Sequence, residues 1–433
     1  MALFAGVATA GAAESRTWQF DFGTGPVASG CQSVTPQSVY SDEAGFGLEN
    51  PPALTSWQGK GNDPLLSDGI SAERPFLFSA AVPPGIYDVS VTFGNPTEST
   101  ELTVKAEARR LIFHQASVEG GKQQTRTFTV AVKSRANADG KLWIKPSQPA
   151  TNWDGKLTLE FNGKNPSISA VKIAPAEKAV GIFIAGDSTV TDQGGALYTG
   201  WGQMLPAFFK SGAYVYNNAQ SGDSLGSFKN NGLFTMMLNT AQPGDYLLVQ
   251  FGHNDQKAKR RKGVDPLTAY RSNLREYVAL GREKKLNVVL ISPMERRRFK
   301  DGVATPTLRS YADTVREVAQ EEKVPFIDLN AESIRLYNTL GEGKSKKLFL
   351  HYGAGAAPDG RSEALSDNTH FDNYGGYELA RIVATGIHKL KLDVSDFLTD
   401  DFVPFDPDQP DDIEKLALPL SPLRQDTAKP EGS

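Results

Sequence analysis

The sequence predicts a multidomain protein in which an all-β sandwich precedes a three-layer α/β domain with a five-stranded parallel sheet. The chain has 433 residues, which makes a single domain unexpected. Short alternating apolar runs fill residues 15–176, and short apolar strands alternate with amphipathic helices over residues 177–396. The predicted units are a signal-like segment (1–14), the sandwich (15–176), the α/β domain (177–396) and a tail (397–433).

The strands of the sandwich are predicted from runs in which apolar and polar residues alternate. Glycine, proline and asparagine separate these runs, and no helical period intervenes. The runs are T-W-Q-F-D-F-G (17–23), F-L-F-S-A-A-V (76–82), I-Y-D-V-S-V-T-F (86–93), E-L-T-V-K-A-E (101–107), T-R-T-F-T-V-A-V (125–132), K-L-W-I-K (141–145) and K-L-T-L-E-F (156–161).

The parallel sheet is predicted from five apolar strands that alternate with helices. They are G-I-F-I-A-G (181–186), A-Y-V-Y-N (213–217), D-Y-L-L-V-Q-F-G (245–252), N-V-V-L-I-S (287–292) and P-F-I-D-L-N (325–330). After the third strand, Asp265 as N-cap and Pro266 predict a helix start, and Thr305 with Pro306 predicts another after the fourth. In such a sheet the functional site lies at the carboxyl ends of the strands.

Composition and the chain ends restrict the classes of function. The net charge of −4 gives no electrostatic indication of nucleic-acid binding, and no apolar run is long enough to span a membrane. Cys31, the single cysteine, excludes an intrachain disulfide and a multi-cysteine zinc site. Residues 1–14 resemble the apolar region and cleavage site of a signal peptide without its basic start, so we expect a secreted or periplasmic protein. The proline- and aspartate-rich tail is expected to extend over the surface and then fray.

Two serines compete for the role of nucleophile. G-D-S occurs at 186–188, and N-N-A-Q-S-G-D-S-L-G at 217–226 contains both G-D-S-L and G-x-S-x-G. Ser188 directly follows the first strand, whereas Ser224 lies in a polar loop well beyond the second. We therefore predict Ser188 as nucleophile and Ser224 as a loop residue near the oxyanion glycine.

The partners of this serine are predicted from the few histidines and from the loop glycines. Of five histidines, His370 lies three residues after Asp367, a spacing that lets the carboxylate reach one ring nitrogen while the other faces the serine. The adjacent loops add Gly222 and the side-chain amide of Asn254, which with the backbone N–H of Ser188 form an oxyanion hole. His253 is expected to be a packed neighbour rather than part of the triad.

Four short blocks in order resemble those of the SGNH hydrolases: G-D-S (186–188), N-x-A-x-x-G (217–222), G-x-N-D (252–255) and D-x-x-H (367–370). The resemblance implies a flavodoxin-like fold, an acyl-serine intermediate, no cofactor and no metal. Four longer segments resemble those of the rhamnogalacturonan acetylesterase branch of this superfamily: A-G-D-S-T-V, T-G-W-G-Q-M-L, Q-F-G-H-N-D-Q-K and D-N-T-H-F. The N-terminal region is similar to the galactose-binding-like jelly-roll sandwich of its bacterial members.

Two basic runs follow the third and fourth strands, K-A-K-R-R-K (257–262) and E-R-R-R-F-K (295–300). Arg296, Arg297 and Arg298 are predicted to contact a polyuronate substrate, and the alternative is a solvated rim. Trp18, Trp57, Trp143 and Trp153 are candidates for sugar stacking, although core packing is the better explanation for most of them.

The resemblance implies an O-acetylesterase that acts on acetylated polysaccharide or oligosaccharide of the pectic rhamnogalacturonan type. We expect this enzyme to be exported, because of residues 1–14, and to be a monomer. Within esterases, the alternatives are another acylated glycan, such as xylan, or a small lipid ester. A non-catalytic glycan-binding protein with the same fold is an alternative of a different class, and the presence of all four blocks argues against it.

Overall fold

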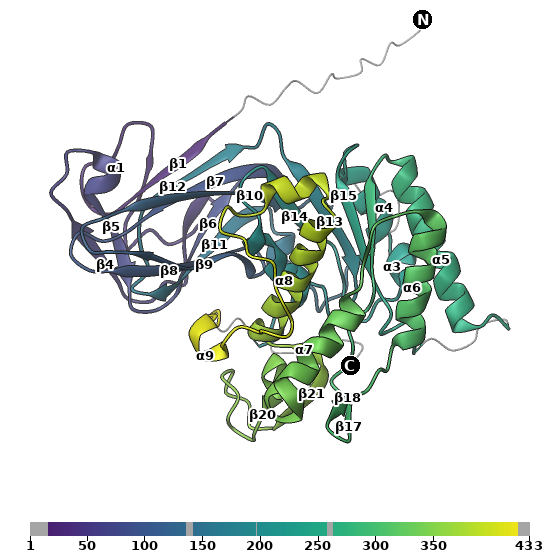
Figure 1. Ribbon diagram of the computed structural model, residues 1–433. Coiled ribbons are helices and arrows are strands. Elements are labelled where there is room, and N and C mark those ends of the chain that lie inside the picture. The colour runs from purple at the N-terminus through teal and green to yellow at the C-terminus, as the bar shows by residue number, and fades with distance from the viewer. Residues whose placement is uncertain (1–15, 136–141, 196, 258–262, 423–433) are drawn as a thin grey trace, which may run out of the picture.

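The protein consists of an all-β sandwich and an α/β domain that pack side by side (Figure 1). A computed structural model describes residues 16–135, 142–195, 197–257 and 263–422. The predicted signal-like segment lies outside these residues, as does the basic run 257–262 except for Lys257. No helix among the described residues combines the length and the apolar character needed to cross a membrane.

The sandwich has two sheets, antiparallel except for the parallel pair β1–β2, with an aromatic core between them. One sheet has the order β10-β7-β12-β1-β2, with β5 on β12 and β4 on β5, and the other has the order β3-β6-β11-β8-β9. Its core includes Phe20, Phe22, Phe78 and Phe161, all nearly inaccessible to solvent. The elements are β1 (Trp18–Phe22), β2 (Gln32–Val34), β3 (Phe46–Glu49), β4 (Leu54–Gln58), α1 (Pro64–Ser67), β5 (Asp68–Ala72), β6 (Phe76–Ala81), β7 (Gly85–Phe93), β8 (Thr100–Ala106), β9 (Arg110–Val118), β10 (Gln124–Val132), η1 (Ala150–Asn152), β11 (Lys156–Lys164) and β12 (Ser167–Pro175).

One predicted strand of the sandwich is wrong. Residues 142–145 of the run K-L-W-I-K have no regular secondary structure. Leu142 and Ile144 pack against the core of the α/β domain. The alternation of apolar and polar residues in this run therefore reflects a contact between the two domains rather than a β-strand. Trp143 between them is 45% exposed, whereas Trp18, Trp57 and Trp153 are partly buried.

The α/β domain has the predicted five-stranded parallel sheet, in the order β14-β13-β15-β16-β19. Alternate strand residues face opposite layers. Ile182 and Ile184 join one core with α2, α7 and α8, and Phe183 and Ala185 join the other with α3 to α6. The elements are β13 (Val180–Gly186), α2 (Trp201–Met204), η2 (Leu205–Phe208), β14 (Ala213–Asn217), α3 (Leu225–Asn230), α4 (Leu233–Thr240), β15 (Tyr246–Gln250), α5 (Pro266–Glu283), β16 (Asn287–Ile291), β17 (Phe299–Lys300), β18 (Val303–Ala304), α6 (Arg309–Glu322), β19 (Phe326–Ile327), α7 (Leu329–Lys344), η3 (Ser345–Leu348), β20 (Phe349–Tyr352), β21 (Leu365–Phe371), α8 (Asn373–Lys389) and η4 (Asp393–Phe397).

The start of one helix differs from the prediction. Asp265 caps α5 as expected, because its carboxylate accepts the N–H groups of residues 267 and 268. By contrast α6 begins at Arg309 rather than at Thr305. The buried Glu295 carboxylate accepts the N–H groups of Thr307 and Leu308 at 2.7 and 2.9 Å, so a distant acid holds these two residues in the non-helical turn that precedes α6.

Residues 397–422 extend over the surface of both domains after η4 (Figure 1). The ammonium of Lys105 in the sandwich donates to the carbonyl of Pro419 at 2.7 Å, and Phe405 is buried against the α/β domain. A short helix, α9 (Ile413–Leu416), interrupts this segment. The domains also share apolar contacts, since Leu111 and Ala131 of the sandwich lie within the two cores of the α/β domain.

Candidate active site

Ser188 lies directly after β13, at the carboxyl end of a strand with a neighbour on each side. The carboxylate of Asp187 accepts the backbone N–H and the hydroxyl of Thr189 at 2.9 and 2.7 Å, which closes the turn around the serine. The Ser188 side chain is buried, so its hydroxyl is largely shielded from bulk water.

His370 and Asp367 reach Ser188 from β21, a strand of a separate two-stranded sheet. His370 Nε2 lies 2.9 Å from the Ser188 hydroxyl oxygen, and His370 Nδ1 lies 2.9 Å from a carboxylate oxygen of Asp367. With Asp367 ionised, Nδ1–H donates to the carboxylate and Nε2 accepts from the serine. The structure thus joins the three residues in one chain of hydrogen bonds, in the arrangement that activates a serine.

The carboxylate of Asp367 is held in its ionised form. Burial raises its pKa, but the hydrogen bond and charge of the His370 imidazole, with the N–H groups of His370 and Thr369, together lower the pKa to about 2. The two N–H groups lie 3.0 and 2.8 Å from one carboxylate oxygen. The second oxygen therefore stays directed at the imidazole.

The three predicted oxyanion donors lie at the ends of adjacent strands. Gly222 follows β14 with a φ of 75°, a conformation that favours glycine. Asn254 follows β15, and its side-chain amide donates to the carbonyl of Asp223 at 3.0 Å, which ties it to the residue after Gly222. Within the described part of the chain, the backbone N–H groups of Ser188 and Gly222 donate to no protein acceptor.

Ser224 has a structural contact of its own. It is the N-cap of α3, where its hydroxyl accepts the N–H of Ser227 and the Ser227 hydroxyl accepts the N–H of Ser224. This reciprocal pair satisfies two N–H groups at the start of the helix. The described residues place no histidine in hydrogen-bond contact with Ser224.

The other histidines have separate partners. His253 is buried, with Nδ1 3.5 Å from Asp187, and burial lowers its pKa more than that carboxylate raises it. His351 donates to the side chain of Asn368 at 3.0 Å, and His114 contacts the Tyr377 hydroxyl at 2.9 Å across the domain boundary.

The three arginines predicted to bind substrate occupy different environments. Arg297 is buried, and its guanidinium donates to Ser345, Asn368 and the carbonyl of Glu342. Arg296 is partly buried and contacts Gln256 and the carbonyl of His253. Of the three, only Arg298 is exposed.

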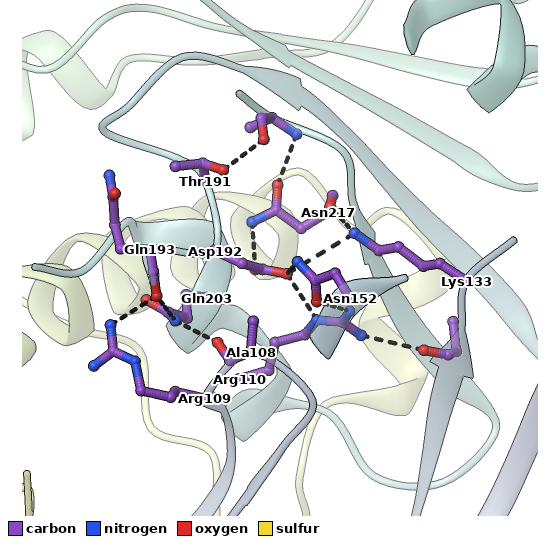
Figure 2. Close-up of polar contacts among 12 residues, drawn as sticks. Ala108, Arg109, Arg110, Lys133, Asn152, Thr191, Asp192, Gln193, Gln203 and Asn217 are labelled. Carbon is purple, nitrogen blue, oxygen red and sulfur yellow. Dashed lines mark hydrogen bonds and ion pairs between the residues drawn. The ribbon is translucent and has the colours of Figure 1, made fainter. Parts of the chain in front are cut away.

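The sandwich contacts the loop that follows Ser188, a feature that the sequence analysis missed. Figure 2 shows the Asp192 carboxylate in contact with four side chains: Arg110, Lys133 and Asn152 of the sandwich and Asn217 at the end of β14. Arg110 Nε and Asp192 are 2.9 Å apart, and both side chains are 1% exposed. Arg109, the neighbouring residue, donates to the carbonyls of Gln193, Gly195 and Tyr198. The sequence feature that could have indicated this contact is the pair of adjacent arginines directly before the apolar run L-I-F.

The comparison with known proteins identifies the family. Residues 184–375 match the GDSL-like lipase/acylhydrolase family, and residues 18–142 match the beta-agarase/YXIM esterase-like, galactose-binding domain-like family. The rhamnogalacturonan acetylesterase RhgT of Bacillus subtilis (strain 168) is 38% identical over 225 residues, which cover 51% of this chain and 95% of RhgT. The chain belongs to the GDSL-like lipase/acylhydrolase family.

Two further comparisons concern YxiM of Bacillus subtilis. The uncharacterized esterase YxiM is 26% identical to this acylhydrolase over 360 residues, which cover 81% of this chain and 88% of YxiM. The X-ray structure of YxiM covers 87% of this chain and 99% of its own, with 24% identity and a TM-score of 0.45. The two family matches show that a galactose-binding-like domain precedes the hydrolase domain in this chain. The protein is a carboxylic ester hydrolase.

Ionisation of Asp367 should make a pH-dependent contribution to the stability of the acylhydrolase. A carboxyl whose pKa falls from 3.8 unfolded to about 2 folded stabilises the fold by about 2 kcal/mol above pH 4, and this contribution disappears as the pH falls through 2. We expect the difference in free energy of unfolding between wild type and Asp367→Asn to shrink steadily as the pH is lowered from 5 toward 2. Urea unfolding of both proteins at a series of pH values measures this difference in free energy of unfolding. A difference that stays constant between pH 5 and pH 2 would contradict the low pKa of Asp367.

Proposed function

We propose that the protein is a carbohydrate O-acetylesterase in which Ser188 is the nucleophile, His370 the general base and Asp367 the residue that orients it. The chain of two 2.9 Å contacts from Ser188 through His370 to Asp367 carries this proposal. It supplies the base and the orienting acid that a serine hydroxyl needs to attack an ester at neutral pH.

In the first half of the proposed reaction, the Ser188 hydroxyl oxygen attacks the acetyl carbonyl carbon while His370 Nε2 takes its proton. The oxyanion that forms accepts hydrogen bonds from the backbone N–H groups of Ser188 and Gly222 and from the amide of Asn254. The imidazolium then gives its proton to the sugar oxygen, which leaves as a hydroxyl, and the acetyl group remains on Ser188.

In the second half, His370 takes a proton from water, and the resulting hydroxide attacks the acetyl carbonyl. The same three donors bind the second oxyanion. Its collapse expels the Ser188 oxygen, which takes the proton back from His370, and releases acetic acid, which loses its proton to water as acetate; the enzyme is thereby regenerated. Within the site, each proton moves between His370 and an oxygen of serine, sugar or water, and we propose that the reaction needs no metal or cofactor.

Acetylated pectic rhamnogalacturonan is the substrate that we propose. Support comes from RhgT and from the probable rhamnogalacturonan acetylesterase YesY of Bacillus subtilis (strain 168), which is 35% identical over 217 residues. Pectic polymers carry carboxylates, and the exposed Arg298 is the arginine of the 295–300 run that we propose to contact them. Arg297 would act only through its contact with Asn368, beside Asp367.

Acetate release should depend on Ser188 and should be highest on acetylated rhamnogalacturonan. We expect Ser188→Ala to remove nearly all turnover, because among the residues that the structure describes no other hydroxyl forms a hydrogen bond with His370. The matched control is Ser224→Ala, which removes a helix cap and should retain turnover at the cost of about 1 kcal/mol of stability. Acetate is measured with acetylated rhamnogalacturonan, acetylated xylan and a chromogenic acetyl ester. Activity on none of these substrates would refute the esterase proposal, and activity that survives Ser188→Ala but not Ser224→Ala would reassign the nucleophile.

Removal of one oxyanion donor should lower kcat more than it changes KM. Because the amide of Asn254 would bind the charge that develops in the transition state, we expect Asn254→Ala to lower kcat about 100-fold to 1,000-fold. Steady-state kinetics with the chromogenic ester separate the two constants. A change confined to KM would show that Asn254 contacts the ground state instead.

A further inference from the structure

Lys145 of the sandwich reaches the loop that carries Gly222. It lies in the connection between β10 and β11, and its side chain is 7% exposed. The ammonium donates to the carbonyl oxygen of Ser221 at 2.5 Å, and the backbone N–H of Lys145 donates to the side chain of Gln220 at 2.8 Å. Leu142 and Ile144 anchor this connection in the core of the α/β domain.

The carbonyl that Lys145 contacts belongs to the peptide group whose N–H is the proposed oxyanion donor. The Ser221 oxygen and the Gly222 N–H point to opposite sides of one planar, conjugated unit. A cation on the oxygen draws electron density from the nitrogen and strengthens the N–H as a donor, as in other chains of hydrogen bonds. The contact also fixes the plane of the peptide, and with it the direction of the N–H.

Lys145 also compensates a carboxylate beside the proposed oxyanion hole. Asp223 follows Gly222, its side chain is 1% exposed, and one of its oxygens lies 3.3 Å from the ammonium. Its other contacts are neutral donors, from Gln220, Ser227 and Asn231. A buried negative charge without a compensating cation would oppose a second negative charge nearby.

We propose that Lys145 is a positioning residue of the oxyanion hole, supplied by the N-terminal sandwich, which orients and polarises the Gly222 N–H and compensates the charge of Asp223. The inference rests on the proposed acyl-serine reaction. It makes the sandwich a part of the catalytic apparatus as well as a neighbouring domain.

Lys105 provides a matched control within the same domain. Its buried ammonium donates to the carbonyl of Pro419 at 2.7 Å and lies 3.3 Å from Glu160, so it has the same kind of partners as Lys145. Its carbonyl partner belongs to the C-terminal segment and to no residue of the proposed site. Lys105→Met should therefore lower stability and leave kcat unchanged.

The test compares Lys145→Met with Lys105→Met in the full chain, with the chromogenic acetyl ester and with a trifluoromethyl ketone that forms a tetrahedral oxyanion on the serine. We expect Lys145→Met to lower kcat about tenfold, less than the loss of a whole donor, and to weaken ketone binding by a similar factor with KM nearly unchanged. Lys145→Arg, which keeps the charge, should recover most of both losses. Equal kcat values for Lys145→Met and Lys105→Met would overturn the inference.

A double variant separates the effect from misfolding. Lys145→Met leaves Asp223 without its cation, whereas Lys145→Met with Asp223→Asn removes both charges. We expect the double variant to fold and to bind the ketone more weakly than Asp223→Asn alone. Equal ketone affinities of these two proteins would refute the role of the Ser221 carbonyl contact. If wild type itself does not release acetate in a Ser188-dependent manner, the proposed function fails rather than this inference.

Discussion

The buried ion pair between Arg110 and Asp192 is the interaction on which the arrangement of the site depends. Both side chains are 1% exposed, and the equally buried ammonium of Lys133 lies 3.9 Å from the same carboxylate. Loss of Asp192 would leave the buried guanidinium without this carboxylate, and breaking a buried pair in this way costs about 3–5 kcal/mol. Asp192 lies four residues after Ser188 and also accepts from Asn217, at the end of the strand before Gly222. One carboxylate therefore joins the sandwich to the loops of both the nucleophile and the oxyanion glycine.

The same region shows how the sandwich supports the candidate site of the α/β domain through contacts with the loops that carry it. Arg109 and Arg110 donate to the loop after β13, and Lys145 donates to the loop after β14. These are long, charged side chains that reach across a domain boundary to backbone carbonyls and to the carboxylates of Asp192 and Asp223. Loops at the carboxyl ends of strands carry most catalytic groups of such folds but have few contacts within the sheet itself. In this protein the N-terminal sandwich supplies the contacts that hold these loops in place.

The sequence predicted the features that follow from local patterns. Alternating runs gave the sandwich, and five buried strands gave the parallel sheet, both of which are confirmed. Ser188, Gly222 and Asn254 were expected side by side because each follows a strand, and His370 was expected near Ser188 because it was the histidine with an acid in reach. The structure joins Ser188 to His370, and Asn254 to the residue after Gly222, and the catalytic roles of these residues remain predictions. Contacts between residues far apart in the chain were missed: Glu295 at the start of α6, Arg110 with Asp192, and the packing of Leu142 and Ile144 outside any sheet. No periodicity encodes such pairs.

The central claim is that Ser188 forms the covalent intermediate, and a mechanism-based label tests it most directly. A p-nitrophenyl phosphonate should transfer its phosphonyl group to the reactive serine with release of nitrophenolate. Trypsin cleavage after Lys210 places Ser188 and Ser224 in different peptides, so mass spectrometry can assign the adduct. We predict one label per chain on the peptide that contains Ser188, and no label in His370→Ala. A label on the Ser224 peptide, or acetate release by a protein that takes up no label, would contradict it.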